Sequence, residues 1–234
     1  SYAMGYEKYN LACLYSEITG DFWSIVYNGC TAALEELKAG SGVTGYCVAP
    51  ATSTDYTQQM DLIDTAKNKG VDGIVLCPSN ADSIGTYVTD VFPDESIPII
   101  VIDRSLNTTS PAVVATYASD AYAMGEAQAQ MMYECYGDVE LTYIDLGMSP
   151  ENKNWADRSF GCIEYAKKNY PNFTSYTGDQ PYWVGQVTQD IAIQYIQDTV
   201  NSNPDKTLCV LATCNSYNNY AIAALSELGE AGAK

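Results

Sequence analysis

An aspartate and an arginine, Asp103 and Arg104, stand side by side directly after the apolar segment 98–102. A carboxylate accepts hydrogen bonds, and a guanidinium offers a planar fork of donors. Such a pair suits a neutral sugar, because every sugar hydroxyl both donates and accepts. The same two side chains could instead form a local ion pair that closes a loop, so the sequence leaves both interpretations open.

Aromatic side chains accompany several predicted loops. Phe22 and Trp23 open a predicted helix, where they could stack on the apolar face of a sugar ring or act as a hydrophobic staple. We expect at least one of these two rings to face a ligand. Trp183 lies in a predicted loop before another helix and could close over the ligand. Trp155 could act as a lid or simply pack.

Further polar candidates lie in the second half of the chain. Arg158 follows the polar segment 147–157 at the start of a predicted helix, where it could bind a ligand or remain a solvated surface arginine. Asn215 follows a predicted strand, and its amide could bind a hydroxyl or cap the next helix. Asn218 could do the same.

Catalytic chemistry has little support in the composition. The chain contains no histidine, which removes the commonest general base, the Ser-His and Cys-His nucleophile pairs and most catalytic zinc sites. Asp103 also lacks an obvious second carboxylate at a strand end, which argues against a glycosidase. We therefore expect a binding protein that is not an enzyme and that uses no cofactor or catalytic metal.

The charge balance excludes some partners. Twenty-nine acidic and 11 basic residues give a net charge of −18. Such a surface repels phosphate backbones and anionic lipids, which argues against nucleic-acid and membrane-surface binding. The same charge could also serve solubility alone.

Eight cysteines are spread along the chain without a C-x-x-C pair, which argues against a zinc ribbon or a thioredoxin-type site. Several lie in apolar strand-like runs, and others lie in helical patterns. We expect most of them to be free core thiols. In an exported protein this would suit a reducing or anaerobic habitat.

Predicted strands and helices alternate along the chain, which indicates parallel sheets covered on both faces. Strands are expected over 10–15, 43–49, 71–78, 98–103, 112–116, 141–145, 173–177 and 207–212. Helices are expected over 22–38 (with Asp21 as N-cap), 55–69, 81–91, 121–136, 154–169, 185–201 and 218–230. The fold class is therefore α/β, with an N-terminal lobe over 9–118 and a C-terminal lobe over 119–234.

The position of the ligand follows from this architecture, because ligands of doubly wound sheets lie beyond the carboxyl ends of the strands. The segment 40–45 matches the pattern G-x-G-x-x-G. A dinucleotide fingerprint requires a strand before it and a helix after it, and here the order is reversed. We interpret the segment as a helix stop.

Several segments in order make the chain resemble the ribose- and galactose-binding class of bacterial solute-binding proteins, known as the periplasmic binding protein type I family. The segments that carry this resemblance are 70–80, 97–104, 118–120, 158–161, 203–205 and 221–232. The resemblance implies two doubly wound lobes that close on a monosaccharide-sized sugar and then present it to an ABC transporter permease in the membrane. It also implies a set of ligand-binding residues: Ser16, Phe22, Trp23, Asp103, Arg104, Arg158, Asn215 or Asn218, and, less directly, Trp183.

The chain departs from this family at two positions and at its end. Cys77 and Gly20 stand where ribose binders place asparagines, which argues against ribose itself. The resemblance implies further strands beyond Lys234, so the second lobe is expected to be incomplete, with weak sugar binding and possible self-association through an open sheet edge. A location in the periplasm or on the outer cell surface, lipid-anchored and without its leader, is expected. A sugar or autoinducer sensor of the same fold is the alternative function.

Overall fold

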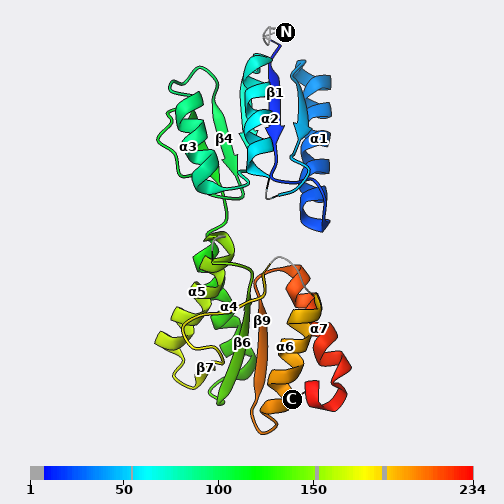
Figure 1. Cartoon of the computed structure of the whole chain (residues 1–234), viewed down its shortest axis with the longest axis vertical. Helices are drawn as coiled ribbons and strands as arrows, with labels where there is room; N and C mark the ends of the chain where they lie inside the picture. Colours follow the sequence, from blue (N-terminus) through cyan, green and yellow to red (C-terminus); the bar gives the residue numbers. More distant parts are fainter. Residues whose placement is uncertain (1–7, 54, 151–152, 186–188, 234) are drawn as a thin grey trace. The chain divides into compact units, whose positions relative to one another are not determined.

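The chain is described by a computed structural model that covers residues 8–53, 55–150, 153–185 and 189–233. Its contacts divide the chain between Ala118 and Ser119 into two compact units, which we call the N-terminal unit and the C-terminal unit (Figure 1). Each unit is built of a parallel sheet and helices, which confirms the predicted α/β class. Within the described part of the chain, no helix combines the length and the apolar character needed to cross a bilayer.

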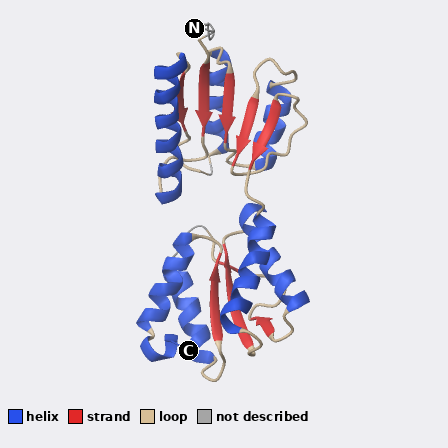
Figure 2. Cartoon of the chain, turned by 180° about the vertical axis from the view of Figure 1, so that it is seen from behind, coloured by secondary structure: helices blue, strands red, loops and turns tan. Residues whose placement is uncertain are grey.

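The N-terminal unit contains a five-stranded parallel sheet with the strand order β2-β1-β3-β4-β5 (Figure 2). Its strands are short apolar runs, as expected where helices cover both faces of a sheet. The strands are β1 (Asn10–Leu14), β2 (Thr44–Val48), β3 (Gly73–Leu76), β4 (Ile99–Ile102) and β5 (Val113–Tyr117).

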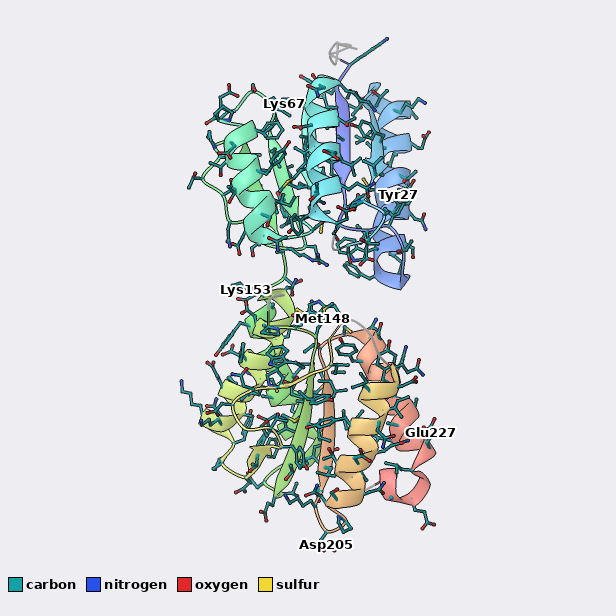
Figure 3. All side chains as sticks on the ribbon, in the orientation of Figure 1. Tyr27, Lys67, Met148, Lys153, Asp205 and Glu227 are labelled. Carbon is teal, nitrogen blue, oxygen red and sulfur yellow. The ribbon has the colours of Figure 1, made fainter. Side chains whose placement is uncertain are left out.

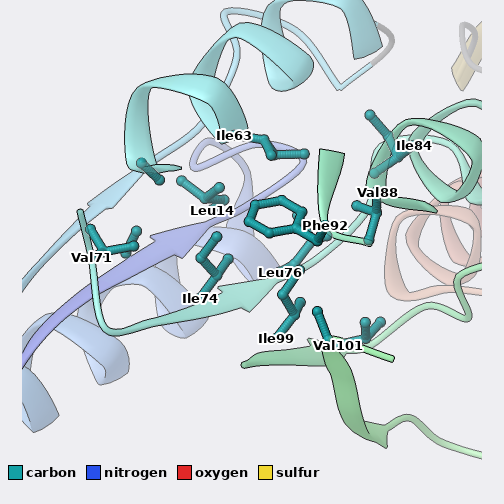
Figure 4. Close-up of a cluster of buried hydrophobic side chains, with 13 residues drawn as sticks. Leu14, Ile63, Val71, Ile74, Leu76, Ile84, Val88, Phe92, Ile99 and Val101 are labelled. Atoms are coloured by element: carbon teal, nitrogen blue, oxygen red, sulfur yellow. The ribbon is translucent and has the colours of Figure 1, made fainter. Parts of the chain in front are cut away.

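Helices connect the first four strands and bury the two faces of this sheet separately. The helices are α1 (Asp21–Ser41), α2 (Tyr56–Asn68) and α3 (Ala81–Val91). On one face, Ile63 of α2 and Val88 of α3 pack against Leu14 and Leu76 of the strands (Figure 4). On the other face, Leu34 and Trp23 of α1 pack around Cys13. Burial of each such side chain contributes about 1.5–3 kcal/mol to folding.

The ends of these helices follow from local sequence. Asp55 and Asn80 cap α2 and α3, because each side chain accepts hydrogen bonds from backbone N–H groups of the first turn. Gly42 ends α1 in the left-handed conformation, in agreement with the interpretation of the glycine-rich segment as a helix stop. The prediction of Asp21 as N-cap is wrong, because the helix begins at Asp21 and the cap position falls on Gly20.

The C-terminal unit contains a parallel sheet centred on its longest strand. β6 (Leu141–Gly147) pairs on one side with β9 (Leu208–Ala212). On its other side β6 pairs first with β7 (Phe173–Ser175) and then, near its carboxyl end, with β8 (Tyr182–Trp183). The sequence predicted three strands here and missed β8, because a two-residue strand carries no periodic signal.

Four helices and a short 3₁₀ helix cover this second sheet. They are α4 (Ala121–Tyr136), α5 (Lys153–Asn169), α6 (Gln189–Ser202), α7 (Asn215–Glu227) and the 3₁₀ helix Gly229–Ala233. Helices α4 and α5 bury Met132 and Ile163 against one face, whereas α6 and α7 bury Ile196 and Ala221 against the other. The predicted last helix, 218–230, is thus displaced by three residues from the observed one.

Close approach of α4 and α5 depends on glycine. A Cβ atom added at Gly125 would lie 2.0 Å from the carbonyl oxygen of Arg158, and one added at Gly161 would lie 2.2 Å from the carbonyl oxygen of Tyr122. Both distances are far shorter than a van der Waals contact. The two helices therefore pack with their backbones in contact, which fixes the position of the α5 turn that carries Arg158.

The cysteines differ in burial. All eight are free thiols, but only Cys13, Cys77 and Cys162 are fully buried, whereas Cys135 is exposed and the others are half-buried. Every cysteine except Cys135 belongs to a hydrophobic core cluster or packs against one, which confirms the prediction that most of them are free core thiols. Three of the eight lie close together in the N-terminal unit, an arrangement that the sequence did not indicate.

Candidate functional site

The carboxyl ends of β1, β3 and β4 bring the first candidates together. Ser16 lies just after β1, Cys77 just after β3, and Asp103 just after β4, and parallel pairing places these three exits at one edge of the sheet. Ser16 is fully buried, and its Oγ lies 3.9 Å from the Sγ of Cys77. Ser16 therefore lies beneath this edge and offers no exposed surface to a ligand in this structure.

Arg104 is the centre of the arrangement. Its Nε lies 3.6 Å from Oδ2 of Asp103, its Nη1 donates a hydrogen bond to the carbonyl of Pro78 at 3.4 Å, and its Cζ lies 5.5 Å from the ring centroid of Trp23. The guanidinium is thus held by an ion pair, a carbonyl and an aromatic face. The ion pair between Asp103 and Arg104 agrees with the local ion-pair interpretation, and ligand binding by the two side chains stays a prediction.

Asp103 adopts a backbone conformation that is uncommon outside glycine. Its φ is 64°, and it is the one non-glycine residue of the described chain in this region. The conformation is strained for a residue with a Cβ, although aspartate tolerates it better than most. The N–H groups on either side hold it, since Asp103 donates to Tyr117 O and Arg104 donates to Ile102 O. Strain of this kind is concentrated at functional sites because it directs a side chain.

The two aromatic residues at the start of α1 have different environments. Trp23 is 7% exposed and packs against Tyr15, whereas Phe22 is 57% exposed. Their rings meet edge to face, with centroids 5.0 Å apart. Trp23 therefore supports Arg104 from the core, and Phe22 is the ring of this pair that is free to stack on a ligand.

Two polar residues of this unit were missed by sequence reasoning. Glu17, directly after Ser16, is half-buried, and burial raises its pKa, while Arg104 and a hydrogen bond from Trp23 lower it. Gln59 of α2 is fully buried and ties two loops together: its Nε2 donates to the carbonyls of Tyr15 and Cys77. Glu17 could have been found from its place in the loop after the first strand. Gln59 lies inside a helix, where sequence gives no such signal.

The carboxyl ends of β6 and β9 bring together candidates of the C-terminal unit. Arg158 of α5 donates from Nη1 to the carbonyl oxygen of Thr213, just after β9, at 2.7 Å. Its Nε is buried and has no hydrogen-bond partner among the described residues. Asn215 follows two residues later as the first residue of α7 and is exposed. Cys214 occupies the N-cap position, so the alternative in which Asn215 or Asn218 caps this helix is wrong.

The end of the unit that holds these groups can be followed in Figure 3. Met148, directly after β6, and Lys153, at the start of α5, lie at the end opposite Asp205, which precedes β9. Parallel strands thus direct their carboxyl ends toward Met148 and Lys153.

The tryptophans of this unit have packing partners. Trp183 belongs to β8, so the prediction that it lies in a loop is wrong. Its half-buried ring packs edge to face against Phe160 of α5. Trp155 packs edge to face against Tyr217, with centroids 5.8 Å apart. The Tyr217 hydroxyl donates to the carbonyl of Gly185 at 2.7 Å. These contacts support the packing interpretation of Trp155.

Asp145 is a buried carboxylate of the C-terminal unit. Asp145 of β6 is 1% exposed, and its Oδ1 accepts a hydrogen bond from the hydroxyl of Ser159, the neighbour of Arg158, at 2.8 Å. Its Oδ2 has no partner in the part of the chain that the structure describes. Burial raises the pKa of Asp145 to about 7. The carboxyl group of Asp145 is therefore not exposed to a ligand.

The chain thus consists of two compact α/β units, each with polar side chains at the carboxyl ends of its parallel sheet. The chain belongs to the periplasmic binding protein domain family, because the model of that family matches residues 12–234. This confirms the resemblance found in the sequence.

Similar curated proteins have names that specify their ligands. The chain is 26% identical over 185 residues to the xylitol-binding protein of Mycolicibacterium smegmatis, and this match covers 78% of the chain and 50% of that protein. It is 27% identical over 187 residues to the D-xylose-binding periplasmic protein of Escherichia coli, and this match covers 79% of the chain and 54% of that protein. The chain thus spans about half the length of the curated relatives it matches.

Solved structures share the fold. An arabinose-binding protein from Geobacillus stearothermophilus has a TM-score of 0.74 at 17% identity, with 96% of this chain and 72% of that one covered. A solute-binding protein of an ABC transporter from Clostridium phytofermentans, with bound β-D-glucose, has a TM-score of 0.72 at 18% identity, with 93% and 68% covered.

Proposed function

We propose that this chain is the ligand-binding part of an extracytoplasmic solute-binding protein that captures a monosaccharide-sized sugar or polyol. The observation that carries the proposal is the grouping of Asp103 and Arg104 with Trp23 at the carboxyl ends of the first sheet. A carboxylate and a guanidinium in fixed orientation match neighbouring sugar hydroxyls, which each donate and accept. Phe22 offers an exposed ring for the apolar face of the sugar.

The C-terminal unit is proposed to add ligands of the same kind. Arg158 is held in position by its hydrogen bond to Thr213, and Asn215, two residues after Thr213, is exposed. Trp183 is a further candidate from β8. Ser16, which is fully buried, is proposed to support the first site from beneath through its contact with Cys77. The names of the curated relatives, which bind xylitol and D-xylose, support a pentose or pentitol as ligand.

No bond needs to be made or broken in this function. Binding would shift an equilibrium between open and closed forms, and the closed form would be recognised by an ABC transporter permease. The periplasmic names of relatives support a location in the periplasm or on the outer cell surface. Lipid anchoring there is part of the proposal. We expect the permease to bind the closed form and not the open form. The sugar would then be the transported molecule and would also induce the conformation that the permease recognises.

The free edge of β9 supports self-association of this chain. β9 pairs with β6, and no other described strand pairs with it. Unpaired backbone groups at a sheet edge can pair with a second copy. Light scattering after gel filtration should show a mass that rises with concentration, and a constant monomer mass would overturn this part of the proposal.

A thermal-shift screen of the full-length protein tests the main proposal. The probes are xylitol, D-xylose, L-arabinose, D-glucose and D-fucose, and the best of them is then measured by calorimetry. At least one should raise the melting temperature and bind with one-to-one stoichiometry. Absence of a shift with all five, or conversion of the sugar into a product during incubation, would overturn the proposal.

A further inference from the structure

Three cysteines from three different elements of the N-terminal unit converge on one point. Cys13 of β1 and Cys47 of β2 are direct partners in the parallel register, so their side chains leave the sheet on the same face. Cys30 lies on α1, the helix that covers this face. The sulfur atoms of all three lie within 4.8 Å of one another.

The distances fit a common ligand at the centre of the three sulfurs. Cys13 Sγ and Cys30 Sγ are 3.2 Å apart, and neither of the other separations exceeds 4.8 Å. A point equidistant from all three therefore lies roughly 2–2.5 Å from each, close to the ~2.3 Å of a zinc–thiolate bond. A metal ion could thus bind with side-chain adjustments of a few tenths of an ångström.

The surroundings favour a soft metal ion with few ligands. Cys13 is 2% exposed, and Cys30 and Cys47 are half-buried among apolar residues of α1 and the sheet. Among the described residues, the cluster contains no carboxylate or imidazole that could act as a fourth ligand. Thiolates select soft ions such as Cu(I), whereas zinc in structural sites takes four ligands.

We propose that Cys13, Cys30 and Cys47 form a three-thiolate binding site for a soft metal ion of the Cu(I) type. The site is separate in chemistry from the sugar site, since it uses sulfur ligands on the face of the sheet that α1 covers. It would tie β1, β2 and α1 together through one ion.

Hydrogen bonds around the cluster are consistent with metal binding. The Sγ atoms of Cys13 and Cys30 lie 3.2 Å apart, within hydrogen-bonding distance for sulfur. Thr31 Oγ1 lies 3.8 Å from Cys47 Sγ and is placed to donate to it. Metal ligands must be thiolates, so donors directed at sulfur prepare the site for an ion.

A disulfide between Cys13 and Cys30 is the competing outcome. It would require the two sulfurs to approach from 3.2 Å to ~2.05 Å and lose two electrons to an oxidant, and it would leave Cys47 as a free thiol. Metal binding engages all three sulfurs. The two outcomes therefore differ in the role of Cys47.

Cu(I) titration of the reduced protein without oxygen, against a chromophoric Cu(I) chelator, tests the proposal. One equivalent should bind, and Cys13→Ser, Cys30→Ser and Cys47→Ser should each lower the affinity at least 100-fold. Cys135→Ser, at an exposed thiol, and Cys162→Ser, at a buried thiol of the other unit, are controls that should bind like the wild type.

A second measurement covers the case in which the buried Cys13 variant fails to fold. X-ray absorption of the wild-type protein loaded with one equivalent of Cu(I) should show three sulfur neighbours around the metal. Unchanged binding in Cys47→Ser, a first shell with fewer than three sulfurs, or a Cys13–Cys30 disulfide found by alkylation and mass spectrometry in the freshly isolated protein would each overturn the proposal.

Discussion

The guanidinium of Arg104 lies over the ring of Trp23, with 5.5 Å between the Arg104 Cζ and the ring centroid. The indole itself is almost fully buried, so it acts as a fixed platform from the core. Asp103 holds the same guanidinium by its Nε. The remaining donors of Arg104 are therefore oriented before any ligand arrives, which reduces the entropy lost on binding.

Replacement of Arg104 should weaken sugar binding. Arg104→Ala removes charge-assisted hydrogen bonds worth about 1.5–3 kcal/mol, which corresponds to roughly a 10–100-fold loss of affinity by calorimetry. Arg104→Lys should lose nearly as much, because an ammonium lacks the planar fork. The control is Lys69→Ala, since Lys69 lies over Tyr46 in a similar contact elsewhere in the unit. Equal affinity in Arg104→Ala and wild type would refute the proposed role.

Gln59 should be a strong determinant of stability. Its side chain satisfies the carbonyls of Tyr15 and Cys77, and its Oε1 accepts from the N–H of Ser79. Gln59→Ala would leave these buried groups without partners and lower the free energy of unfolding in urea by about 2–4 kcal/mol. Gln58→Ala, at the exposed neighbouring position, is the control and should lose less than about 1 kcal/mol. Similar losses in both variants would contradict a stabilising role of the three hydrogen bonds made by the Gln59 side chain.

Two helix glycines should respond in opposite directions to alanine. Gly125→Ala would force the new methyl group against the Arg158 carbonyl, so we expect a loss of about 3 kcal/mol or more. Gly29→Ala introduces its methyl into open space in the middle of α1 and should raise stability by about 0.5–1 kcal/mol. Thermal unfolding of both variants checks the difference. If Gly125→Ala were as stable as the wild type, the backbones of α4 and α5 could not be in contact at this position.

Asp145 should make stability fall as the pH rises. Burial raises its pKa in the folded protein to about 7, above the value of ~3.9 in an unfolded chain. Between these values the folded state holds a proton that the unfolded state releases, so the free energy of unfolding decreases from about pH 4 to about pH 7.

Asp145→Asn tests this dependence, because asparagine can still accept from Ser159 but cannot ionise. Above pH 7 the variant should be more stable than wild type, by on the order of 1–3 kcal/mol in urea unfolding. At pH 4 the two should be similar. Asp157→Asn, which also replaces one carboxylate by an amide but at an ion pair with Lys153, is the matched control. An unchanged slope in Asp145→Asn would show that another group is responsible.

Residue patterns alone were enough to predict most of the elements. The periodicity of 121–136 and the apolar run around Ile99 depend on local burial, and the structure contains α4 over Ala121–Tyr136 and β4 over Ile99–Ile102. The position of Asp103 and Arg104 at the carboxyl end of a strand could also be predicted, because both residues directly follow the apolar segment 98–102 in the sequence.

Contacts between distant segments were decided only by the tertiary structure. Trp23 is buried beneath Arg104, which is distant in sequence, and Gln59 binds backbone groups 18 to 44 residues away. The two-residue strand β8 exists only through its register with β6. Cys13, Cys30 and Cys47 had no spacing signal, because a thiol site assembled from two strands and a helix requires the sheet register and the position of α1. Sequence determines which segments form elements, whereas side-chain convergence is a property of how those elements pack.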